Sequence, residues 1–135
     1  MPDTLLEIFE TTAQVHADQP AMARKRAGAW EKTTWREYRD AVRRAARALV
    51  ATGVEPGQGV VILAFNRPEW YVANLATIAV GARPAGIYTN TTPEQCRYIT
   101  EHAEAAVAVV ENRESLERLQ AAGGRPAGLE AIVLM

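Results

Sequence analysis

The residues best placed for chemistry follow the apolar runs of the chain, because open parallel sheets bind ligands beyond the carboxyl ends of their strands. These segments are Asn66-Arg67, Tyr88-Thr89-Asn90 and Glu111-Asn112-Arg113. None of them carries a recognisable catalytic mechanism. A phosphate-binding loop would need glycines between a strand and a helix. Gly57-Gln58-Gly59 precedes its expected strand and Gly123-Gly124 follows a helix, so neither segment is a nucleotide motif.

Nucleophiles, bases and metal ligands are few. Ser115, the only serine, falls in the first turn of an expected helix, with no G-x-S-x-G around it. His16 and His102 lie in different expected helices and have no metal-ligand spacing with each other or with Cys96, the only cysteine. We interpret the histidines as partly exposed surface residues and Cys96 as a buried thiol. The residues alone therefore predict no catalytic group and no metal site.

Composition narrows the class of protein. The chain has 135 residues, 48% of them hydrophobic, which is enough for one domain with a core. Its formal net charge of -1 argues against a non-specific nucleic-acid binder. No window approaches the length of a transmembrane helix, and Asp3 and Glu7 do not fit a signal peptide. We expect a cytoplasmic protein; peripheral membrane association and homo-oligomerisation stay open.

The elements that must position any site are organised around residues 60–92. The apolar run 60–65 is typical of a strand covered on both faces, as in a parallel sheet. Asn66 with Glu69, and Pro68 in the first turn, predicts a helix start, and Gly81 predicts its end. A second strand at 85–88 completes a βαβ unit.

Similar patterns flank this unit. A capping box at Thr4 starts a helix that ends near His16, and a β-hairpin is expected at 21–26 and 30–33. Thr34 starts a long helix with arginines on one side, which we interpret as a solvated surface rather than a phosphate site. Its expected apolar face comprises Trp35, Tyr38, Val42, Ala45, Leu49 and Val50. Downstream we expect a helix from Thr92 to near Glu104, a strand at 106–110, a helix capped by Asn112, and a strand at 131–135.

These elements sum to an α/β fold: an open, mainly parallel sheet of four strands with flanking helices, preceded by an N-terminal helix and a β-hairpin. A parallel strand is normally followed by its crossover helix, and the last strand reaches residue 135 without one. We therefore expect residues 1–135 to be a truncated, N-terminal part of a larger domain, with no second domain.

The order and spacing of several short motifs resemble the N-terminal portion of the AMP-forming acyl-CoA synthetases, in the adenylate-forming superfamily. The motifs are Thr-Trp-Arg-Glu-Tyr (34–38), Gly-Val-x-Pro-Gly (53–57), Asn-x-Pro-Glu-Trp (66–70), Gly-Ile-Tyr-Thr (86–89) and Thr-Pro-Glu-Gln (92–95). Residues 66–70 and 87–95 are most similar to the long-chain fatty-acid group, including its "bubblegum" branch. The resemblance covers nearly the whole chain.

The resemblance implies a reaction and a limited site. Family members condense a carboxylate with Mg-ATP to an acyl-adenylate and then pass the acyl group to CoA. It implies that Tyr88, Thr89, Asn90 and Arg113 lie near the CoA nucleotide, and that no catalytic or metal-binding residue falls in this chain. ATP, magnesium and fatty-acid contacts would lie downstream, so the chain alone is expected to be inactive. The alternatives are a stand-alone binding or oligomerisation module and a small free-standing nucleotide binder.

Overall fold

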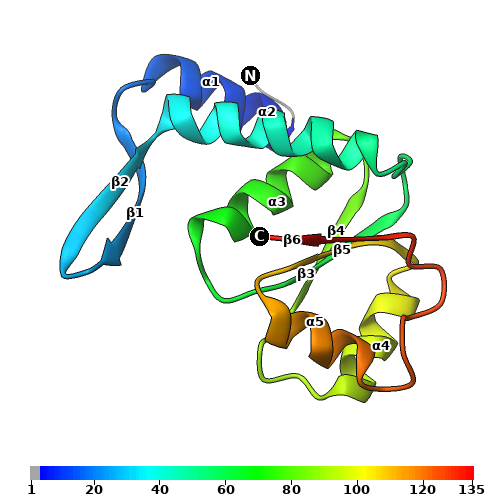
Figure 1. Cartoon of the computed structure of the whole chain (residues 1–135). Helices are drawn as coiled ribbons and strands as arrows, with labels where there is room; N and C mark the ends of the chain where they lie inside the picture. The colour runs from blue at the N-terminus through cyan, green and yellow to red at the C-terminus, as the bar shows by residue number, and fades with distance from the viewer. Residues whose placement is uncertain (1–3) are drawn as a thin grey trace.

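A computed structural model describes residues 4–135, and it confirms the predicted α/β fold (Figure 1). Four strands form a wholly parallel sheet in the order β4-β3-β5-β6, and β1 and β2 form a separate antiparallel hairpin. The elements are α1 (Leu5–Val15), β1 (Pro20–Arg26), β2 (Ala29–Thr34), α2 (Trp35–Ala51), β3 (Gly59–Leu63), α3 (Pro68–Ala79), β4 (Arg83–Ile87), α4 (Pro93–His102), β5 (Ala105–Val110), α5 (Arg113–Gln120) and β6 (Ala131–Leu134).

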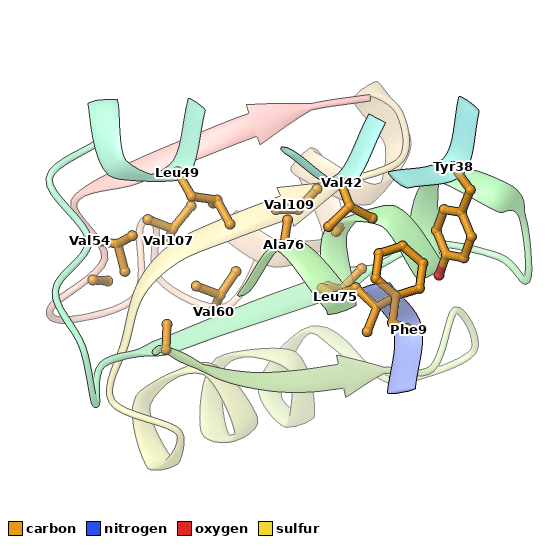
Figure 2. Close-up of a cluster of buried hydrophobic side chains, with 14 residues drawn as sticks. Phe9, Tyr38, Val42, Leu49, Val54, Val60, Leu75, Ala76, Val107 and Val109 are labelled. Atoms are coloured by element: carbon orange, nitrogen blue, oxygen red, sulfur yellow. The ribbon is translucent and has the colours of Figure 1, made fainter. Parts of the chain in front are cut away.

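The two central strands, β3 and β5, are buried along their whole length, as the unbroken apolar run predicts. Alternate side chains point to opposite faces of the sheet. Val60, Ile62, Val107 and Val109 pack with α2 and α3 on one face (Figure 2). Residues such as Val61 belong to a second cluster, on the face covered by α4 and α5. Because both faces of the central strands are apolar, polar side chains that could bind a ligand must lie in the loops at the ends of the strands.

The N-terminal elements are held by an aromatic cluster and a tight turn. Phe9 of α1 contacts Tyr38 of α2 edge to face, with ring centroids 5.0 Å apart, and also approaches Trp35. The hairpin turns at Ala27 and Gly28, both with positive φ, which matches the right-handed twist of its strands. Figure 1 shows the hairpin projecting from one end of the α1–α2 layer.

Capping predictions are confirmed at four helices and wrong at one. Thr4, Thr34 and Thr92 each complete a capping box, and Asn112 caps α5. Helix α3 instead has Arg67 as its N-cap, without a side-chain hydrogen bond, and Pro68 needs no partner because it lacks an N–H. Asn66, the predicted cap, accepts a hydrogen bond from the Tyr71 hydroxyl at 2.6 Å.

A second correction concerns Val50, which was predicted to lie on the apolar face of α2. Its exposed fraction is 62%, whereas Leu49 next to it is buried. Consecutive helical residues point about 100° apart, so the apolar stripe that includes Leu49 cannot also place Val50 inward. Within residues 4–135, none of the helices combines the length and apolar character needed to cross a bilayer.

Candidate functional site

The carboxyl ends of β3, β4 and β5 meet at one edge of the sheet, where the loops leading to α3, α4 and α5 gather (Figure 1). We call this the carboxyl edge. Two hollows along it are lined by loop residues. The α5 hollow lies between the β4–α4 loop and α5, and is lined by Phe65, Thr89, Asn90, Thr91, Pro93, Glu114, Glu117, Arg118 and Ala121. The β4 hollow is lined by Ala64, Phe65, Asn66, Trp70, Tyr71, Gly86, Ile87, Tyr88 and Thr89.

The structure brings three of the four predicted site residues to these hollows. Thr89 lines both hollows, Asn90 lines the α5 hollow and Tyr88 lines the β4 hollow. Tyr88 follows the last residue of β4, although it was predicted within that strand, and its exposed fraction is 83%. Arg113 is the exposed first residue of α5, but it is not among the residues that line either hollow.

Local capping interactions position these side chains. Thr92 accepts a hydrogen bond from the backbone N–H of Gln95 at 3.3 Å, and its own N–H donates to the Gln95 side chain at 3.1 Å. This box fixes the end of the loop that carries Tyr88, Thr89 and Asn90. Asn112 caps α5 by accepting from the Ser115 N–H at 2.9 Å, so Arg113 begins the helix. The N-terminal end of a helix favours anions, because its free N–H groups carry partial positive charge.

A chain of alternating charges reaches the carboxyl edge from the hairpin, and sequence reasoning missed it. The Glu31 carboxylate accepts from Arg24 at 3.1 Å, and Arg24 also donates to Glu69 at 3.2 Å. Glu69 accepts from Arg67 at 2.7 Å, and Arg67 donates to Glu111 at 3.1 Å. No sequence pattern predicts this chain, because its members come from β1, β2, the start of α3 and the end of β5.

The charges in this chain affect one another's protonation. A hydrogen bond from the Arg67 guanidinium lowers the pKa of the Glu69 carboxyl, against the opposing effect of burial. The same hydrogen bond raises the pKa of Arg67. The Arg67 and Glu69 side chains therefore both stay ionised at neutral pH, and the ion pair between them persists there.

Of the residues considered for nucleophilic or metal chemistry, Cys96 and His102 belong to α4, and His16 lies at the end of α1. Cys96 is buried and unpaired, and burial raises the pKa of its thiol, which disfavours the reactive thiolate. His102 is exposed and stacks on Tyr98 with ring centroids 5.5 Å apart, and His16 caps the C-terminus of α1. Among residues 4–135, no group of three or more His, Cys, Asp and Glu side chains could hold a metal ion.

Comparison with known proteins gives one consistent match. A family model described as AMP-binding enzyme matches residues 9–134. The chain is 39% identical over 121 residues to the long-chain-fatty-acid–CoA ligase ACSBG2 of Gallus gallus, which covers 86% of this chain and 16% of that protein. It is 35% identical to the long-chain-fatty-acid–CoA ligase ACSBG1 of Bos taurus, over 98% of this chain and 18% of that protein.

A solved structure agrees with these relatives. The crystal structure of the anthranilate CoA ligase AuaEII in complex with anthranoyl-AMP matches with a TM-score of 0.87 and 26% sequence identity. The match covers 96% of this chain and 24% of that chain. The chain therefore has the fold of an N-terminal subdomain, and it spans less than a fifth of the length of the two ligases above.

Proposed function

The chain belongs to the AMP-binding enzyme family, and we propose that it is the N-terminal part of a long-chain fatty-acid–CoA ligase. The names of the two ligases to which it is similar over most of its length support the substrate class. In the full-length enzyme a fatty acid and Mg-ATP would form an acyl-adenylate with release of pyrophosphate, and the CoA thiol would then take the acyl group with release of AMP.

We assign this subdomain to the CoA side of that reaction. The observation that carries the assignment is the carboxyl edge, where an exposed aromatic ring and a short polar loop line two hollows and the N-terminus of α5 lies at the same edge of the sheet. CoA contains an adenine ring and phosphates, and these groups are bound by aromatic stacking and by cationic or N–H donors. Tyr88, the polar loop and Arg113 therefore fit the nucleotide end of CoA, whereas Glu114 and Glu117 in the α5 hollow disfavour a phosphate at that point.

Each of the four residues has a separate role in this proposal. Tyr88 offers an exposed ring face for stacking on the adenine. Thr89 and Asn90 supply a hydroxyl and an amide in the hollow between the β4–α4 loop and α5. Within residues 4–135, the Arg113 side chain forms neither an ion pair nor a hydrogen bond. Its guanidinium is therefore free to bind phosphate.

The remaining chemistry is assigned elsewhere. Contacts to ATP, magnesium and the acyl chain are expected in the larger part of the enzyme that this chain does not span, and the chain alone is expected to make no acyl-adenylate. Localisation in the cytoplasm and peripheral attachment to a membrane belong to this proposal as well. Incubation of the 135-residue chain with palmitate and Mg-ATP should yield no acyl-AMP, and measurable turnover would contradict the expectation.

The CoA assignment is tested by calorimetric titration of the chain with CoA. Arg113→Ala should weaken CoA binding by about 10- to 150-fold, because one charge-assisted hydrogen bond contributes about 1.5–3 kcal/mol and each 1.4 kcal/mol is a factor of ten. Arg125→Ala is the matched control, since Arg125 is an exposed arginine in the loop before β6. Equal affinity in the two variants would remove Arg113 from the site, and no CoA binding by the wild-type chain would refute the assignment of this edge.

A second candidate function is a non-catalytic binding or oligomerisation module. It is favoured by β6, whose apolar side chains are only half-buried, with an exposed fraction of 58% for Leu134. Exposed apolar strands at a sheet edge favour association. Light scattering that shows a concentration-dependent dimer, together with no binding of CoA, would favour this module over the ligase subdomain.

A further inference from the structure

The β3–α3 loop, residues 64–67, is shared by several hollows at the carboxyl edge. Phe65 lines both the α5 hollow and the β4 hollow. Asn66 lines the β4 hollow and, with Arg67, a third hollow beneath the hairpin. A displacement of this loop would therefore change the shape of all of these hollows at once.

Apolar packing does little to hold this loop in place. Ala64 is buried, but the exposed fraction of Phe65 is 64% and Asn66 is also exposed. The Phe65 ring therefore contributes little burial energy that would fix the backbone. The loop must be fixed by polar contacts.

Glu111 supplies two of these contacts. One of its carboxylate oxygens accepts from the Phe65 backbone N–H at 2.7 Å, and the other accepts from the Arg67 guanidinium at 3.1 Å. The side chain of Glu111 is only 15% exposed, and its own N–H donates to the Leu63 carbonyl at 3.0 Å. The carboxylate is thus anchored to the end of β3 and bridges both ends of the loop that follows.

We propose that Glu111 is a positioning residue, whose carboxylate holds the β3–α3 loop as the shared wall of the hollows at the carboxyl edge. The identification of the ligand as CoA rests on the proposed function. The role of Glu111 in holding the loop does not depend on that identification. The bridge requires a carboxylate because Glu111 faces two donors, an N–H and a guanidinium. A glutamine amide has one acceptor oxygen, so it would present its own NH₂ group to one of those donors.

The rest of the charge chain gives a way to separate this role from a general one. Glu69 links Arg67 to Arg24 of the hairpin and makes no hydrogen bond to Phe65. Glu69→Gln should therefore loosen the hairpin without releasing the loop. Glu104→Gln is a matched control, because Glu104 pairs with Arg83 at 2.9 Å beside the amino ends of the strands, away from the loop.

The test is amide hydrogen exchange measured by NMR on the 135-residue chain. Glu111→Gln should speed exchange at Phe65 by about tenfold or more, while amides in the middle of β3 and β5 keep their wild-type rates. Glu104→Gln and Glu69→Gln should leave Phe65 unchanged. Wild-type exchange at Phe65 in Glu111→Gln, an equal acceleration along all of β3, or failure of the variant to fold would overturn the proposal.

The dissociation constant for CoA is a second measurement. It should not change if Glu111 only stabilises the fold. In Glu111→Gln the dissociation constant for CoA should rise about tenfold with only a small fall in the thermal midpoint, because the loop wall is displaced while the core is intact. An unchanged dissociation constant would show that the loop does not shape the CoA site. If wild-type chain does not bind CoA, the proposed function fails, and the exchange rates still decide whether Glu111 holds the loop.

Discussion

Replacement of Gly59 by alanine tests the closest backbone approach in the sheet. Gly59 begins β3, and its N–H donates to the Glu104 carbonyl at 3.1 Å. A Cβ added at Gly59 would overlap the Ala103 carbonyl oxygen and lie 3.1 Å from the Cα of Ala105. Both neighbours are backbone atoms, Ala103 in the turn after α4 and Ala105 at the start of β5, so no side chain can rotate away.

The expected cost follows from this geometry. Relief of the overlap requires the α4–β5 turn to move away from β3, which stretches the hydrogen bond between Gly59 and Glu104. Forced shifts of a packed backbone cost about 1–3 kcal/mol, and the weakened hydrogen bond adds about 1 kcal/mol. We therefore expect Gly59→Ala to lower the free energy of unfolding by about 2–4 kcal/mol.

Urea denaturation followed by circular dichroism measures this change. With a slope of about 2 kcal/mol per molar urea, the middle of the typical range, the midpoint should fall by about 1–2 M. Gly128→Ala is the control: Gly128 has φ +78° but open space around it, so alanine there meets only backbone strain of about 1–2 kcal/mol. A midpoint for Gly59→Ala equal to or above that of Gly128→Ala would refute the steric argument.

Two further predictions concern buried ionisable groups. Burial raises the pKa of Tyr38 to about 12, so the folded state keeps the phenol proton that the unfolded state loses near pH 10. The free energy of unfolding should therefore fall as the pH rises between these two values. A Tyr38→Phe variant should show less of this loss in alkaline denaturation curves. The Cys96 thiol should react with DTNB at least about a hundredfold more slowly in the native chain than in 6 M guanidinium, and rapid native reaction would contradict its burial.

Much of the fold could be predicted because it depends on local patterns. The capping boxes at Thr34 and Thr92 need only residues three positions apart. The buried strands β3 and β5 are continuous apolar runs, and Gly81 has the positive φ expected of a helix end. Each of these features is decided within a few residues, so the sequence contains the whole signal.

The rest depends on contacts between distant residues. The Asn66 cap was predicted from Glu69, but Glu69 binds Arg67 and Arg24 instead, the latter 45 positions away. Glu111 bonds to the Phe65 N–H 46 positions away, and a glutamate after a strand gives no sign of this role. The site residues Tyr88, Thr89, Asn90 and Arg113 were indicated by their place after expected strands and by family resemblance, and their roles stay predictions.

The distribution of polar and apolar groups separates two interfaces of this subdomain. At the carboxyl edge, the Thr92 capping box and the Glu111 carboxylate fix polar loops around open hollows, which suits a small polar ligand. Strand β6 instead presents Ile132 and Val133 to opposite faces, both half-buried, and contains no charge or proline that would prevent pairing. Strand β4 does contain a proline, Pro84, which removes one N–H donor. The β6 edge therefore favours pairing with another polypeptide segment, whereas the polar loops of the carboxyl edge suit a ligand.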